Sequence, residues 1–122
     1  MKARENMVRL KQFQVNEKRR RILQLDAMIN EFDRMAAELE AQIAAEEAKS
    51  GITDQNHFAY PTFAKAARLR RDNLKTSKAE LLQQKEQVEA ELAEAEAELR
   101  KAEALESRDA KRDSVSARAM TG

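Results

Sequence analysis

Two segments of the chain carry apolar residues at the spacing of a coiled-coil seam. In the first segment, one row of apolar residues recurs every seven positions, and a second row follows it by three positions. The first row holds Val15, Ile22, Ile29, Ala36 and Ile43, and the second holds Leu25, Phe32 and Leu39. Because charged residues fall between these positions, the pattern predicts a long helix with one buried stripe.

A matching pattern occurs in the second half of the chain. One row spaced by seven holds Ala67, Leu74, Leu81, Val88, Ala95 and Ala102, and the row beside it holds Leu92 and Leu99. Lys78 and Lys85 occupy that second row nearer the middle of the chain, where their aliphatic stems can cover apolar neighbours while the ammonium groups reach water. The two stripes predict two helices that bury their apolar faces against each other.

The composition favours a thin, all-α structure. The chain has 122 residues, of which 37% are charged and 4% aromatic, with two glycines and one proline. The many charged residues and the scarcity of glycine and proline favour helices, but so few aromatic residues are poor material for a compact core. The absence of cysteine excludes disulfides and thiolate metal sites. Because no apolar run approaches the roughly 18 residues of a membrane span, we expect a soluble, cytoplasmic protein without membrane insertion.

The charges form four blocks of alternating sign. Residues 1–21 carry 8 basic and 2 acidic side chains, residues 26–47 carry 1 and 7, residues 64–78 carry 6 and 1, and residues 79–106 carry 3 and 9. If the chain folds back near residue 56, the first block faces the fourth and the second faces the third. The blocks therefore favour an antiparallel arrangement, either within one hairpin or between two open helices of a dimer.

A hairpin register and element bounds follow from these patterns. We expect residue numbers across the seam to add up to roughly 117, which pairs Ile29 with Val88 and Ile43 with Leu74. Gly51 is a helix stop, and Pro61 suits the first position of the second helix. The predicted elements are a helix over about residues 3–49, a tip over about 50–61, a helix over about 62–106, and a frayed or disordered tail over 107–122.

The sequence offers few parts for catalysis. His57 is the single histidine, and no glycine-rich loop is present. A lone histidine in a polar turn is usually solvated, and the many glutamates of residues 80–106 are typical of an exposed helix face. We therefore expect no enzyme activity, no cofactor and no metal.

Two basic clusters and a methionine pair have alternative interpretations. The run Lys18 to Arg21 and the cluster Arg68, Arg70 and Arg71 can attract phosphates, but acidic blocks of similar charge lie beside them, so we expect no nucleic-acid binding. Met28 and Met35 are seven residues apart beside the seam. Packing at the seam edge is the favoured interpretation for them, and an adaptable partner groove is the alternative.

The segment HFAYPTF, residues 57–63, concentrates the aromatic residues of the chain. It contains Phe58, Tyr60 and Phe63, three of the five aromatic side chains. These rings either cap the end of the seam, against Ile52, Ile43 and Ala66, or remain exposed as anchors for another protein. The two interpretations are compatible.

Two stretches resemble a known family. MKARENMVRLKQFQVNEKRR at residues 1–20 and GITDQNHFAYPTFAKAARLRRDNL at residues 51–74 resemble the flagellar export protein FliJ in its alphaproteobacterial form. The resemblance implies a two-helix antiparallel coiled coil in the flagellar type III export apparatus, at the cytoplasmic face of the basal body. It also implies binding to the hexameric export ATPase and to the cytoplasmic part of the membrane export gate, and help in delivering export substrates or their chaperones.

The predicted contact residues come from the chemistry of this chain. For the gate we select Phe58, Tyr60, Phe63, Arg70 and Arg71, and for the ATPase we select Arg19, Arg20 and Arg21. The second set lies within residues 1–21. These residues and roughly residues 96–116 form the ends of the hairpin that would insert into the ATPase ring. An unrelated coiled-coil adaptor or scaffold is the alternative function, and a nucleic-acid binder is a third.

Overall fold

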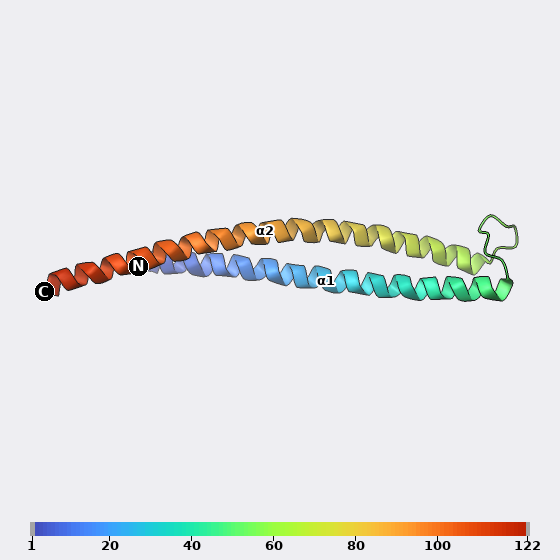
Figure 1. The fold of residues 1–122 in the computed structure, drawn as a ribbon, viewed down its shortest axis with the longest axis horizontal. Helices are drawn as coiled ribbons and strands as arrows, with labels where there is room; N and C mark the ends of the chain where they lie inside the picture. Colours follow the sequence, from blue (N-terminus) through green and yellow to red (C-terminus); the bar gives the residue numbers. More distant parts are fainter. Residues whose placement is uncertain (1, 122) are drawn as a thin grey trace. The chain divides into compact units, whose positions relative to one another are not determined.

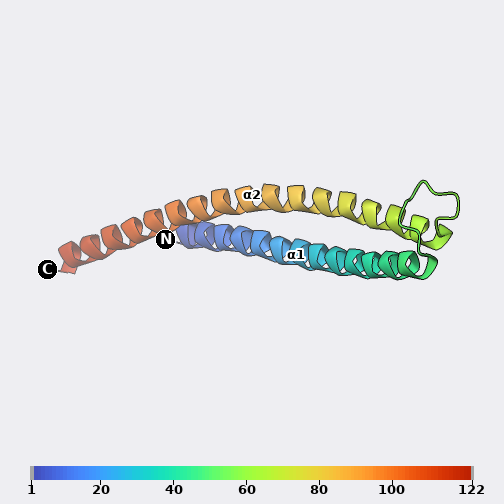
Figure 2. The same cartoon turned by 45° about the vertical axis from the view of Figure 1, so that its right-hand side comes forward.

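The protein is a hairpin of two long helices. The structure is a computed structural model that describes residues 2 to 121. Helix α1 covers Lys2–Ser50, 49 residues, and helix α2 covers Thr62–Thr121, 60 residues. The two helices run antiparallel and pack against each other (Figures 1 and 2), and the described residues contain no strand. The predicted all-α helical hairpin is confirmed.

The hairpin consists of two compact units, each built from a stretch of both helices. Met1–Leu23 packs with Glu86–Gly122, and Gln24–Lys85 forms the second unit, which includes the connection between the helices. We call the first the terminal unit and the second the tip unit.

Every predicted apolar seam residue is buried or half-buried, and Ala64, outside the predicted rows, is fully buried as well. Val15 and Leu25 are fully buried. The other buried members of the predicted rows are Ile29, Leu39, Ile43, Ala67, Leu81 and Ala102. The half-buried members are Ile22, Phe32, Ala36, Leu74, Val88, Leu92, Ala95 and Leu99. The heptad prediction is confirmed, because every apolar position that it names avoids full exposure.

The charge blocks meet as the sequence predicts. In the terminal unit, Lys11 pairs with Glu98 at 2.7 Å and Lys18 with Glu91 at 2.8 Å. In the tip unit, Lys78 of the third block pairs with Asp33 at 2.7 Å and Lys75 with Glu40 at 3.6 Å. Lys85, a basic residue within the fourth block, pairs with Asp26 at 2.7 Å. Each exposed pair is worth only about 0–1 kcal/mol, so the pairs select the antiparallel arrangement more than they stabilise it.

Within the described residues, neither helix has a stretch long and apolar enough to cross a membrane.

The predicted register is wrong by about five residues. The paired numbers add up to 109 for Lys11 and Glu98, to 111 for Asp33 and Lys78, and to 115 for Glu40 and Lys75. These sums lie below the predicted 117. The observed helix ends, residues 50 and 62, add up to 112. The helix ends agree with the observed register, whereas an a/d pattern alone can be buried at several alignments that differ by three or four residues.

Backbone geometry fixes the ends of both helices at the connection. Gly51 has a φ of 73°, a left-handed conformation that favours glycine after a helix. Its N–H donates to the carbonyl of Glu47 at 2.9 Å, which closes the last turn of α1. The carbonyl of Pro61 accepts a hydrogen bond from the N–H of Lys65 at 3.1 Å. Helix α2 begins at Thr62, as predicted. Pro61 is therefore the N-cap residue and not, as predicted, the first residue of the helix.

The prediction of a frayed or disordered tail over residues 107–122 is wrong for the described residues. Helix α2 continues to Thr121. Asp109 accepts a hydrogen bond from Arg4 Nε at 3.0 Å, so the two helices still contact each other there. The side chains of residues 111–119 are all exposed. The loss of the apolar period removes packing, but the segment contains no glycine or proline before Gly122 to end the helix.

The buried leucine of the seam gives a direct test of the packing. We expect Leu25→Ala to lower the free energy of unfolding by about 2–4 kcal/mol, because Leu25 is fully buried. The matched control is Leu23→Ala, since Leu23 is 69% exposed and its truncation changes the same free energy by at most about 0.5 kcal/mol. Urea unfolding followed by circular dichroism measures both. Equal losses in the two variants would contradict the assigned seam.

Candidate functional site at the hairpin tip

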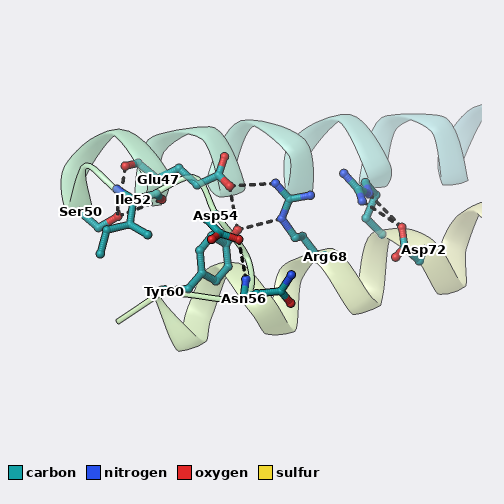
Figure 3. Close-up of polar contacts among 9 residues, drawn as sticks. Glu47, Ser50, Ile52, Asp54, Asn56, Tyr60, Arg68 and Asp72 are labelled. Carbon is teal, nitrogen blue, oxygen red and sulfur yellow. Dashed lines mark hydrogen bonds and ion pairs between the residues drawn. The ribbon is translucent and has the colours of Figure 1, made fainter. Parts of the chain in front are cut away.

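The connection between the helices is held by a chain of local hydrogen bonds. The N–H of Asn56 donates to Asp54 Oδ1 at 3.0 Å (Figure 3), and the N–H of His57 donates to the carbonyl of Asp54 at 3.1 Å. The N–H of Ala59 donates to His57 Nδ1 and the N–H of Tyr60 donates to the carbonyl of His57, both at 3.0 Å. Asx-type turns of this kind satisfy backbone groups that a helix no longer pairs.

Tyr60 closes the end of the seam and belongs to a polar triad with both helices. The residue is only 8% exposed. Its hydroxyl donates to Glu47 Oε2 at 2.9 Å and accepts from Arg68 Nε at 2.8 Å, while Arg68 Nη2 donates to the same Glu47 oxygen at 2.8 Å (Figure 3). The guanidinium carbon lies 6.0 Å from the centre of the Tyr60 ring. The triad ties the last turn of α1, the connection and the first turns of α2 together.

The triad stabilises its own charges. Hydrogen bonds from Arg68 and then from Tyr60 lower the pKa of Glu47 below its ordinary value. The hydrogen bonds to Tyr60 and to Glu47 raise the pKa of Arg68 above its ordinary value. Both residues therefore stay ionised at neutral pH, and the ion pair between them is largely shielded from solvent.

The other two rings of the tip remain accessible. Phe58 is 97% exposed and Phe63 is 54% exposed. The imidazole of His57 stacks on the Phe58 ring, with 4.7 Å between the ring centres and 23° between the planes. A ring this exposed, supported only by a neighbour in the same loop, can serve as an anchor for another protein.

The two arginines selected beside the tip have different environments. Arg71 lies in the seam row and is half-buried, and it donates to Asp72 Oδ1 from Nε at 3.2 Å and from Nη2 at 3.0 Å. Arg70 is exposed. Of the gate residues that the sequence suggests, Phe58, Phe63 and Arg70 are thus accessible, whereas Tyr60 and Arg71 contribute mainly to packing.

The three arginines selected for the ATPase belong to the terminal unit. Arg19 lies 3.8 Å from Glu96 of α2, and Arg20 lies 2.8 Å from Glu17 of its own helix. Arg21 is exposed and also interacts within the chain. The ion pairs of Arg19 and Arg20 are exposed, so each contributes little to stability.

Sequence reasoning missed the triad that organises the tip. It assigns Arg68 to a basic cluster and Glu47 to an acidic block, and it does not connect either residue with Tyr60. The available signal is an acidic residue in the last turn of the first helix, together with an arginine two turns into the second. The described residues contain no group of three or more His, Cys, Asp or Glu side chains placed to hold a metal ion.

Comparison with models of protein families, with curated proteins and with solved structures finds no match for this chain.

The lowered pKa of Glu47 predicts a pH dependence of stability. Because its folded-state pKa lies below the ordinary 4.5, ionised Glu47 stabilises the fold above that pH, and the contribution is lost as the pH falls through the folded-state pKa. We therefore expect Glu47→Gln to be less stable than the original chain at neutral pH, with the difference shrinking in acid. Urea unfolding at several pH values measures it.

The control for this prediction is Glu46→Gln. It removes the same charge from the neighbouring residue of α1, whose side chain makes no hydrogen bond or ion pair among the described residues. We expect it to leave the pH dependence of the original chain nearly unchanged. A constant difference between Glu47→Gln and the original chain at all pH values would contradict the assigned role of Glu47.

Proposed function

We propose that this protein is a non-enzymatic component of the bacterial flagellar type III export apparatus. In this proposal it is a stalk-like helical hairpin that links the export ATPase ring to the membrane export gate and assists substrate delivery. The resemblance of residues 1–20 and 51–74 to the FliJ family supports it. The observation that carries it is a helical hairpin whose connection presents the almost fully exposed ring of Phe58.

The gate contact in this proposal is centred on the exposed rings of the tip. Phe58 and Phe63 supply the apolar anchors, and Arg70 supplies an accessible charge seven residues after Phe63. Tyr60 acts indirectly, because its ring closes the seam and its hydroxyl binds Glu47 and Arg68. The triad thereby holds the loop that carries Phe58 in one conformation, which lowers the entropic cost of binding.

The ATPase contact in this proposal uses the basic surface of the terminal unit. Arg19 and Arg20 have side chains that are 57% and 65% exposed. Their ion pairs within the chain are weak, so carboxylates of a surrounding ring can compete for them. Such a contact depends on salt and dissociates readily, as a transient export complex requires.

An unrelated coiled-coil adaptor or scaffold is the alternative that the same architecture accommodates. The two functions differ in their partners. A component of the export apparatus binds the export ATPase and the gate, whereas an unrelated adaptor has no affinity for either. Binding of the purified chain to both proteins at low and at physiological salt separates them.

The test in cells is deletion of the gene, followed by assays of swimming and of flagellar filaments. We expect the deletion to abolish swimming and the original gene to restore it. Phe58→Ala should restore it poorly and should weaken binding to the purified gate domain roughly tenfold or more, the usual loss at an aromatic hot spot.

The control variant is Leu23→Ala, which removes another exposed apolar side chain (69% exposed) from the terminal unit. We expect it to restore swimming fully. Normal swimming of the deletion strain would refute the export function. Full rescue by Phe58→Ala would refute only the assignment of the gate contact to the tip.

A further inference from the structure

The two flanks of the seam in the tip unit differ in their chemistry. Positions spaced by seven on one side of the α1 seam are acidic and form ion pairs with α2. These pairs are Asp26 with Lys85, Asp33 with Lys78, and Glu40 with Lys75. Charged side chains thus bridge this flank from one helix to the other.

Among the described residues of the tip unit, no ion pair between the helices lies on the opposite flank. The positions on that side of the α1 seam, again spaced by seven, are Met28, Met35 and Gln42. Met28 is 42% exposed and Met35 is 36% exposed. Between the helices a groove of about 430 Å³ opens on this flank, and it is lined by Met35, Glu38, Leu39, Gln42, Arg70, Asn73, Leu74 and Ser77. Leu39 and Leu74 belong to the seam core and supply apolar surface to the groove.

Arg70 is the charged residue of the groove without a partner among the described residues. Its neighbours in the same basic block are satisfied, since Arg68 pairs with Glu47 and Arg71 with Asp72. Glu38, the acidic residue of the groove, is held by Arg34 of its own helix. A carboxylate brought by a ligand is therefore the missing counter-charge of this groove.

We propose that this groove binds an amphipathic helix of a partner protein, with apolar side chains on Met35, Leu39 and Leu74 and a carboxylate paired with Arg70. A helix laid into an apolar groove is a common mode of recognition, and exposed methionines adapt to different apolar surfaces. The bound helix becomes the third helix beside α1 and α2 in the tip unit. This inference goes beyond the proposed function and holds whether the hairpin serves export or another assembly.

A second copy of this chain docked groove to groove does not supply the missing counter-charge. Docking groove to groove brings a second Arg70, and the carboxylate that each groove contains is already held by Arg34. The charge of the groove therefore disfavours groove-to-groove self-association and favours an acidic partner helix.

The probe that tests the inference is a synthetic helical peptide of three heptads, with leucine at the a and d positions and glutamate at the positions flanking them. A second peptide has lysine in place of each of these glutamates. Fluorescence anisotropy of the labelled peptides, titrated with the full chain, measures binding. We expect the acidic peptide to bind at least about tenfold more tightly than the basic one.

Charge reversal in the protein identifies the surface. Arg70→Glu should lower the affinity for the acidic peptide by roughly tenfold or more and should raise the affinity for the basic peptide. Its control is Lys65→Glu, which reverses the other basic side chain of the block that lacks an ion pair. Met35→Glu should also lower the affinity for the acidic peptide. Its control is Leu82→Glu, because Leu82 is similarly exposed and follows Lys75 by seven residues on the bridged flank.

Several results would overturn the inference. One is that the acidic peptide does not bind. Another is that Arg70→Glu lowers the affinity for this peptide no more than Lys65→Glu does. Analytical ultracentrifugation could also show a dimer that Met35→Glu dissociates, which would assign the groove to a second copy. Circular dichroism of each variant verifies that the helices are intact.

Discussion

The structure depends on the burial of one narrow apolar stripe from each helix against the other. Val15 and Leu25 are the largest side chains that lose all contact with solvent, and alanine fills many of the remaining seam positions. A single helix cannot remove such a stripe from water, so the helices form together and the connection is held at their junction. The ion pairs along the flanks add little energy, but they decide which stretches of the chain face each other.

Features that depend on local periodicity are predictable from the sequence, and features that depend on alignment are not. The seam rows and the pairing of charge blocks follow from spacing and sign alone. The register does not, because a stripe with a repeat of three and four residues matches its partner at several offsets. The extension of α2 to Thr121 was missed for a related reason, since an absence of apolar residues predicts an absence of packing and does not end a helix.

The candidate site shows the same division. Neighbouring residues on a helix point about 100° apart, so the seam row itself indicates that Arg71 is partly buried while Arg70 lies beside it. Arg71 follows Ala67 by four residues and precedes Leu74 by three, which places it on the same face of the helix as these two seam residues. The burial of Tyr60 depends instead on Glu47 and Arg68, which lie 13 and 8 residues away and meet only after the chain turns. No local pattern distinguishes Tyr60 from the exposed Phe58.

The short connection also has a consequence for how the chain folds. Glu47 and Arg68 are separated by 21 residues, whereas Arg4 and Asp109 are separated by 105. Closing the longer loop first costs about 1.4 kcal/mol more chain entropy than closing the shorter one. We therefore expect folding to nucleate around Gly51 and the aromatic turn and to zip outward, so that each contact shortens the loop that the next must close.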